Sequence, residues 1–373
     1  MVGAPEFFAL PKRRHASQPL TALLPYLTLR PMHQKLRPSH HAQATIGLAL
    51  ACLFWGLSFP ASKALTLLYL KEIPGESSWF VVGLQGTLRF GIAGIVMVIL
   101  SWRTLPSLTK RETTQGLLLG LFGGLGMVFQ VDGLTYTRAS TSAFLTQTYC
   151  ILVPLYHAVV ARRFPRPVQI VATIGVIGGI AILSKIDWTQ FRMGRGEFET
   201  LLSTVFFTVQ ILVLDAPRFF RNRTKMVSSV MFITTAVVFA AVSILSNHSF
   251  DSYKIAAGIG QQFYLIAILV IFCTLLAFNL MNRCQKYIPA SEAALIYTLE
   301  PVSTSLFATF LPICLSALVG IQYDNEQLSV GLLIGGGLIL SANLVMQIWG
   351  HLPVPHAGET PAPTTLHPGD GSR

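Results

Sequence analysis

Long apolar stretches constrain the fold of this sequence more than any other feature. Between residues 45 and 349, runs of about 18–25 mostly apolar residues alternate with short charged loops. A helix needs about 20 apolar residues to cross the hydrocarbon core of a bilayer. The pattern predicts an all-α polytopic membrane protein with ten transmembrane helices, at approximately residues 45–70, 79–100, 115–135, 139–160, 168–184, 197–214, 226–246, 261–281, 291–313 and 329–349.

Composition supports this class and argues against two others. The chain is 52% hydrophobic and only 12% charged, whereas soluble domains average about 25% charged residues. The net charge of +11 is spread over alternating loops rather than gathered on one polar domain, so we predict no nucleic-acid partner. The five cysteines show no C-x-x-C spacing and no neighbouring histidine set, so no metal and no other cofactor is predicted.

Lysine and arginine are distributed unequally between alternate loops. Most lie on the side of the N-terminus, in clusters such as 12–14, 162–166 and 218–225. The opposite side holds only Lys71, Arg138, Lys185, Arg192, Arg195 and Lys254. This bias predicts an integral membrane protein with both termini in the cytoplasm, placed in a bacterial inner (cell) membrane.

Both ends of the chain differ from the apolar region in composition. Residues 1–44 are basic and interrupted by prolines, which indicates a flexible cytoplasmic tail, with an organelle transit peptide as the alternative. Residues 351–373 are rich in Pro, Gly and Thr and are expected to be a disordered tail.

Two short similarities indicate an internal repeat. IGGIAILS (177–184) and IGGGLILS (334–341) match at six of eight positions, and ASTSAFL (139–145) resembles ASEAALI (290–296). Each copy would contain five spans, so the second copy would cross the membrane in the opposite sense. We therefore expect two inverted five-helix repeats, residues 45–184 and 197–349, with a binding site near the bilayer midplane between them.

Glycines recur at four-residue spacing in three of the spans. They are Gly116, Gly120 and Gly124, then Gly175 and Gly179, then Gly331 and Gly335. Small residues at this spacing let helices approach closely in lipid. The pattern leaves open whether they serve a homodimer or packing within one chain.

Charged residues at bilayer depth are the first candidates for a functional site. At about 1.5 Å per residue, ten residues carry a helix halfway through a core of about 30 Å, which places Glu300, Arg89 and Tyr149 near the midplane. A central charge costs about 2.5–3.5 kcal/mol on insertion scales and normally faces a bundle interior or a wet cavity. Glu300 is expected either to line the pathway, contacting a cationic group or cycling a proton, or to stabilise the fold only. In the second case it would pair internally with Arg89 as its midplane charge partner or hydrogen-bond a neighbouring helix.

Several neighbouring residues are candidates for the wall of the same pathway. Pro301 is expected to break the helix beside Glu300. Lys63, in the outer third of the first span, either faces the pathway or extends to the membrane interface. The aromatic and amide candidates for a small-molecule pocket, each alternatively a helix-packing residue, are Trp55, Gln147, Tyr149, Asn279 and Tyr297.

Six segments together resemble the drug/metabolite transporter superfamily, specifically its EamA-type ten-helix carriers. They are FWGLSFPASK (54–63), LRFGIAG (88–94), SAFLTQTYCILVPL (142–155), ALIYTLEPVSTSL (294–306), and NEQLS (325–329) followed by IGGGLIL (334–340). The resemblance implies two five-helix halves that move small organic solutes, often outward and often amino acids or related metabolites. The family usually has an acidic residue after span four. Here that loop, ARRFPRP (161–167), has none, which puts a symmetric role for Glu326 in doubt.

The function expected from these observations is secondary transport. The chain would move small organic metabolites by alternating access, through efflux or exchange, with a proton or counter-substrate as the coupling partner. An intramembrane enzyme and a non-transporting receptor or scaffold are the alternatives. Neither H-E-x-x-H nor G-x-S-x-G occurs, and no P-loop is present, so we predict that the chain is not an enzyme.

Overall fold

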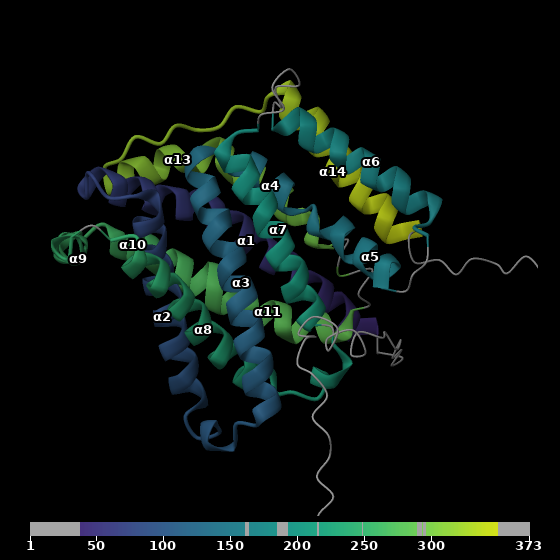
Figure 1. Cartoon of the computed structure of the whole chain (residues 1–373), viewed down its shortest axis with the longest axis horizontal. Coiled ribbons are helices and arrows are strands. Elements are labelled where there is room, and N and C mark those ends of the chain that lie inside the picture. The colour runs from purple at the N-terminus through teal and green to yellow at the C-terminus, as the bar shows by residue number, and fades with distance from the viewer. Residues whose placement is uncertain are drawn as a thin grey trace, which may run out of the picture.

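The structure, a computed structural model, describes residues 38–160, 164–184, 193–214, 216–247, 249–288, 293 and 296–349. These residues form helices joined by short connections (Figure 1). The predicted C-terminal tail and residues 1–37 of the predicted N-terminal tail lie outside the described residues, as does most of the loop between the fifth and sixth predicted spans. The first helix begins at Pro38, so the last residues assigned to the N-terminal tail are helical.

The helices fall close to the predicted spans. The chain up to residue 184 contains α1 (Pro38–Glu72), α2 (Ser78–Ser101), α3 (Lys110–Tyr136), α4 (Ala139–Thr146), α5 (Tyr149–Val160) and α6 (Pro167–Leu183). The remainder contains α7 (Arg195–Leu214), α8 (Thr224–Leu245), α9 (Asp251–Gly258), α10 (Gln262–Val270), α11 (Ala277–Cys284), α13 (Leu299–Val319) and α14 (Val330–Trp349). A π-helical segment, Ile271–Leu276, makes α10 continuous with α11.

Helix length and hydropathy agree with a membrane-spanning protein. Over the described ranges, eight helices are long and apolar enough to cross a membrane, counting α4 with α5 and α10 with α11 as one each. The two remaining candidates, α6 and α14, are apolar but shorter. Large apolar side chains point outward from the longer helices. Among them are Ile99 and Leu100 on α2 and Val237 and Leu245 on α8, which are 61–85% exposed. Such a surface suits lipid rather than water.

The helices pack side by side in one bundle (Figure 1). α2 packs along α8, and α3 lies between α7 and α8. α1 packs against α13 on one side and against α10 and α11 on another. α6 and α14 form a pair at the edge of the molecule that touches the rest mainly through α4 and α5.

A capping box and an ion pair fix the start of α3. Glu112 N donates to Thr109 Oγ1 at 3.2 Å, and Thr109 N donates to Glu112 Oε2 at 2.9 Å. The reciprocal bonds satisfy two backbone donors that a helix start leaves unpaired. Arg223, at the N-cap of α8, donates from Nε to Glu112 Oε1 at 2.7 Å. This contact joins the start of α3 to the start of α8.

The predicted glycine series on α3 packs within the chain. A Cβ built at Gly116 would meet Val230, one at Gly120 would meet Thr234, and one at Gly124 would meet Val238, all on α8. The four-residue spacing therefore serves close contact between two helices of the same chain. Gly179 likewise approaches Gly335, because a Cβ at Gly179 would lie 2.6 Å from Gly335 O.

Replacing Gly120 by Ala should destabilise the protein. The added Cβ would lie 2.5 Å from Thr234 Cβ and 2.6 Å from Met231 O, so α3 and α8 must separate. Overpacking of this kind costs about 1–3 kcal/mol. Gly91→Ala on α2 is the matched control, since its Cβ would meet nothing within 4 Å. Thermal unfolding in detergent should show a lower midpoint for Gly120→Ala only; equal midpoints for both variants would contradict the packing.

Candidate functional site

The helix that follows α3 is interrupted halfway along its length. α4 ends at Thr146 and α5 begins at Tyr149, so Gln147 and Thr148 form a turn inside an otherwise apolar stretch. Irregular backbone persists at membrane depth only where protein surrounds it or where it lines a cavity. Asn343 Nδ2, on α14, donates to Gln147 O at 3.3 Å. The interruption is therefore held by a helix from the far end of the chain.

A second interruption precedes α13. Thr298 is a turn residue and α13 begins at Leu299. The break therefore lies before Glu300, whereas the sequence had indicated Pro301. Pro301 occupies the first turn of α13 and is buried there. A proline at that position loses little, because the N–H groups of a first helical turn have no intrahelical partner.

The two interruptions face each other. Gln147 Nε2 lies 3.4 Å from Tyr297 O and 3.4 Å from Glu300 Oε2. One amide thus connects the turn after α4 with the turn before α13. Tyr149, the first residue of α5, lies close enough to Glu300 for the two side chains to interact electrostatically. The structure therefore brings together Gln147, Tyr149, Tyr297 and Glu300, four of the residues that the sequence singled out.

Glu300 is half-buried and has no basic partner among the described residues. Its carboxylate accepts the hydrogen bond from Gln147, and none of the ion pairs in the described ranges includes it. The buried thiols of Cys52 and Cys150 lie within electrostatic range. A cationic group that reached this position would therefore find a carboxylate that no lysine or arginine neutralises.

Trp55 forms an aromatic wall beside the second interruption. Its ring centroid lies 5.9 Å from that of Tyr297 and 5.5 Å from that of Phe278. The next residue, Gly56, brings α1 against α13, because a Cβ built there would lie 2.7 Å from Ser303 Cβ. α1 is thus held close to the start of α13.

Arg89 is buried, but the structure does not pair it with Glu300. Arg89 Nε donates to Thr274 Oγ1 at 2.8 Å, Nη1 to Ser58 Oγ at 3.0 Å, and Nη2 to Cys273 O at 3.3 Å. Thr274 and Cys273 belong to the π-helical segment between α10 and α11. Neutral groups therefore surround the guanidinium, which ties α1 and α2 to that segment.

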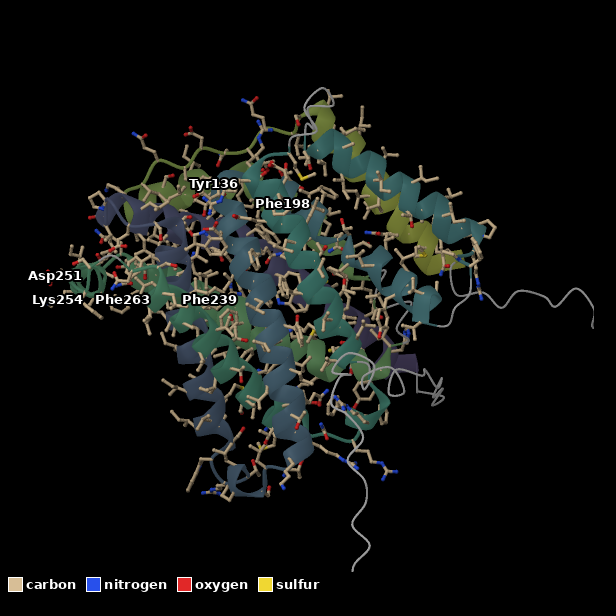
Figure 2. All side chains as sticks on the ribbon, viewed as in Figure 1. Tyr136, Phe198, Phe239, Asp251, Lys254 and Phe263 are labelled. Carbon is tan, nitrogen blue, oxygen red and sulfur yellow. The ribbon has the colours of Figure 1, made fainter. Side chains whose placement is uncertain are left out.

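Two further predicted residues lie apart from the interruptions. Asn279 Nδ2 donates within its own helix, to Leu275 O at 2.7 Å. Lys63 reaches past the end of α3, where its Nζ donates to Thr137 O at 2.5 Å and lies 5.8 Å from the ring centroid of Tyr323. Lys63 therefore belongs to a second polar region, at one end of the helices. Tyr136, at the end of α3, lies in the same region among side chains that carry nitrogen and oxygen (Figure 2).

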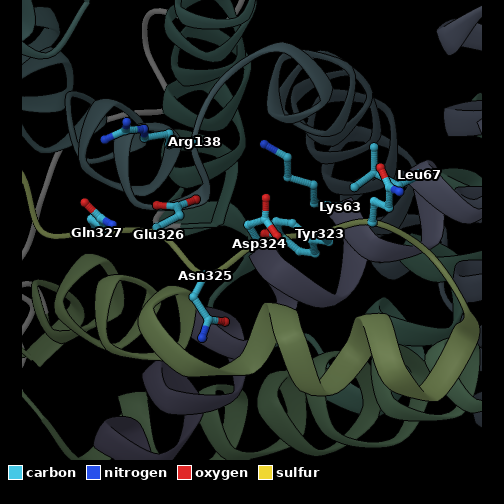
Figure 3. Close-up of a pocket in the computed structure, with 9 residues that line it drawn as sticks. Lys63, Leu67, Arg138, Tyr323, Asp324, Asn325, Glu326 and Gln327 are labelled. Atoms are coloured by element: carbon cyan, nitrogen blue, oxygen red, sulfur yellow. The ribbon is translucent and has the colours of Figure 1, made fainter.

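A hollow of about 470 Å³ opens beside Lys63 (Figure 3). Its lining consists of Lys63, Leu67, Arg138, Gln322, Tyr323, Asp324, Asn325, Glu326 and Gln327. Lys63 and Arg138 supply positive charge, and Asp324 and Glu326 supply negative charge. Burial of Tyr323 raises the pKa of its hydroxyl, which keeps that residue neutral. A second hollow of about 370 Å³ shares Lys63 and Arg138 and extends between α4, α6 and α14.

Glu326 links the first hollow to the interrupted helix. Its Oε1 accepts from Ala139 N at 2.6 Å, and its Oε2 accepts from Ser140 N at 3.3 Å and from Ser140 Oγ at 2.5 Å. The carboxylate thus caps the N-terminus of α4, where the helix dipole favours negative charge. α4 has eight residues, so about 12 Å separates this cap from Gln147. No feature of the sequence predicted that Glu326 caps α4.

The sequence did not predict that three charged residues lie together. Asp132 on α3 is buried and pairs with Arg195 on α7, which also pairs with Glu199. Arg195 had been assigned to an outer loop, and no motif connects it with Asp132. The available signals were Asp132 and Glu199 themselves, acidic residues near the ends of two predicted spans.

The interrupted helices bring a carboxylate, an amide and aromatic rings together inside an apolar bundle. This arrangement defines a class of protein, the polytopic membrane transporter. Comparison with known proteins agrees with this class. The family model described as "EamA-like transporter family" matches residues 43–185 and 196–347. The chain therefore belongs to the EamA-like transporter family, within the drug/metabolite transporter superfamily.

Two individual proteins illustrate the similarity. A relative from Archaeoglobus fulgidus named "Uncharacterized transporter" is 27% identical over 308 residues, which cover 82% of this chain and 86% of the relative. A solved structure titled "Crystal structure of protein" is 19% identical with a TM-score of 0.50 and covers 82% of this chain and 97% of that chain. The second likeness concerns the fold alone. Family and relative together identify an integral membrane transporter of a small-molecule substrate and point away from an enzyme.

Replacing Glu326 by Ala should destabilise the protein, because the N-terminus of α4 loses its cap. Loss of a helix N-cap costs about 1–2 kcal/mol. Asp324→Ala is the control, since Asp324 is an exposed carboxylate two residues away in the same connection. Thermal unfolding in lipid nanodiscs should give a lower midpoint for Glu326→Ala than for Asp324→Ala. If Asp324→Ala lowered the midpoint as much, general loop charge rather than the cap would account for the effect.

Proposed function

We propose that this protein is a secondary transporter that moves small organic metabolites, amino acids or related compounds, by alternating access. Two five-helix halves, residues 45–184 and 197–349, would rock against each other around a site between them. Movement would be efflux or exchange, coupled to a proton or to a counter-substrate. The proposed location is a bacterial inner membrane with both termini in the cytoplasm, as the loop charges favour.

The observation that carries this proposal is the contact between the two helix interruptions. Transporters built from inverted repeats bind their substrates at discontinuous helices near the midplane. Here Gln147 follows α4 in the first proposed half, Glu300 opens α13 in the second, and the two side chains are hydrogen-bonded. A site shared in this way changes when either half moves.

Packing within the chain supports two related halves of opposite orientation. α6 and α14, which carry the two similar glycine segments, pack against each other through Gly179 and Gly335. α2 and α8 also pack against each other, and they hold the same position in the two halves. The two segments matched by the family model, 43–185 and 196–347, nearly coincide with the proposed halves.

The chemistry of the site favours a substrate with a cationic group. Glu300 has no basic partner in the part of the chain that the structure describes, so an ammonium group or a proton can neutralise it. Trp55, Tyr149 and Tyr297 add aromatic surface, which attracts cations and packs against apolar groups. Amino acids and related amines combine these properties.

Counterflow in proteoliposomes tests the proposed activity. The purified protein would be reconstituted with a mixture of unlabelled amino acids and related amines inside, and uptake of each labelled compound would be measured. Saturable uptake that depends on the internal solute would support a carrier and name its substrate class. A flux that never saturates would indicate a channel, and no exchange of any compound would count against transport of this class.

Replacing Glu300 by Gln should impair transport while leaving the protein folded. The neutral amide keeps the shape and loses the charge, so an ammonium substrate loses a charge-assisted hydrogen bond of about 1.5–3 kcal/mol. The half-saturating concentration should rise about 10–100-fold. Asp251→Asn, an exposed carboxylate on α9 that pairs with Lys254, is the control and should transport normally. Normal kinetics with an unchanged pH profile in Glu300→Gln would remove this residue from the mechanism.

A further inference from the structure

A second group of acidic residues lies away from Glu300, where α7 begins and α3 ends. Arg195 Nη2 lies 2.5 Å from Asp132 Oδ2, and Arg195 Nε lies 2.7 Å from Glu199 Oε1. One guanidinium therefore serves two carboxyl groups, one from each helix. Its remaining contacts are neutral, since Arg195 Nη1 donates to Tyr136 OH at 2.9 Å and Nη2 lies 3.4 Å from Ser78 Oγ.

Each carboxyl group has one oxygen that the arginine does not reach. Asp132 Oδ1 and Glu199 Oε2 are buried and have no hydrogen-bond donor among the described residues. The Asp132 side chain is 0% exposed and the Glu199 side chain 8% exposed, so solvent does not replace the missing donors. Both carboxyl groups contact the same guanidinium, Asp132 at Nη2 and Glu199 at Nε, so the two side chains are neighbours. Two carboxylates cannot supply a donor to each other, because both are acceptors.

The backbone holds these groups together at close range. Gly133 follows Asp132, and Gly196 follows Arg195. A Cβ built on Gly133 would lie 2.6 Å from Gly196 O, and one built on Gly196 would lie 2.6 Å from Gly133 O. α3 and α7 therefore touch directly beside the carboxyl pair. Neither glycine position therefore has space for a side chain.

Charge and hydrogen bonding lead to the same requirement. Two carboxylates and one guanidinium leave one uncompensated negative charge in a buried position, which is costly. A single proton cancels that charge and also supplies the donor that the two free oxygens lack. We propose that Asp132 and Glu199 together bind one exchangeable proton, at a site separate from Glu300.

Two further charged groups, Glu197 and Lys63, lie at the end of α3, and both are bonded to Thr137 there. Thr137 Oγ1 donates to Glu197 Oε1 at 2.6 Å, and Lys63 Nζ donates to Thr137 O at 2.5 Å. These two opposite charges lie on the side of the hollows, so neither supplies a donor to Asp132 or Glu199.

The location of the pair indicates that the proton would control the contact between the two proposed halves, an inference that rests on the proposed function. Asp132 belongs to the first proposed half and Glu199 to the second, so the proton bridges the two halves. Its loss would leave two negative charges in direct contact, and repulsion would favour separation of α3 from α7. The pair is thus the coupling site for a proton, while the interrupted helices bind the organic substrate.

Infrared spectroscopy detects the bound proton without any transport assay. The protein would carry Glu300→Gln, which removes the carboxyl group of the proposed substrate site, and spectra would be recorded across a pH series in H₂O and D₂O. We expect a protonated-carboxyl C=O band that shifts in D₂O and disappears at high pH. The same band should be lost in Asp132→Asn and in Glu199→Gln, because the remaining carboxylate then pairs one-to-one with Arg195. Asp251→Asn should retain it.

The possible results separate this proposal from the one before it. A folded protein without the band at any pH would overturn the shared proton, even if one of the two variants failed to fold. A band that survives both substitutions would place the proton elsewhere. Thermal stabilisation by sodium chloride, with no band, would assign the pair to a sodium ion and also overturn the proposal. Because the band needs no substrate, a negative counterflow experiment would leave this result intact.

Discussion

The need to satisfy backbone groups away from water governs this structure. A continuous helix meets that need by itself, but an interrupted helix leaves N–H and C=O groups that lipid cannot pair. The turn at Gln147–Thr148 and the turn at Thr298 solve this problem jointly, because Gln147 reaches Tyr297 O and Asn343 reaches Gln147 O. The two interruptions thus share hydrogen bonds at the candidate site.

α4 connects the two facing turns to the charged hollow at one end of the molecule. Its first residues are capped by Glu326, and the turn that follows its last residue contacts Glu300. Glu326 follows α13 in the chain, and Glu300 lies in the first turn of α13. α13 and the connection after it thus hold α4 at both ends. α4 therefore spans the distance of about 12 Å between the hollow and the candidate site.

The sequence predicted the helical class and the apolar spans well, because twenty apolar residues in a row have few other uses. It also singled out Glu300 as a candidate, since a carboxylate at that depth is energetically costly, and the structure places it beside Gln147. The interruption at Gln147–Thr148 was not predicted, because neither Pro nor Gly marks it and the only local signal is a short polar run. The pairing of Asp132 with Arg195 was not predicted either, since it depends on how α3 meets α7, which no local pattern encodes. The proline beside Glu300 was read as the break, but a first-turn proline fits an intact helix start.

Arg89, which is buried, and Arg195, which is partly exposed, differ in the groups that surround them. Arg89 is surrounded by hydroxyl and carbonyl groups, which cannot change charge, so it acts as a fixed tie between α1, α2 and the π-helical segment. Arg195 is surrounded by two carboxyl groups, whose charge can change, and it lies where α3 and α7 touch. Glu300 has no arginine partner in the part of the chain that the structure describes, and its carboxylate accepts a hydrogen bond from the Gln147 amide. In a transporter, a fixed charge holds helices together, whereas a charge that a proton or a substrate can cancel allows the helices to move.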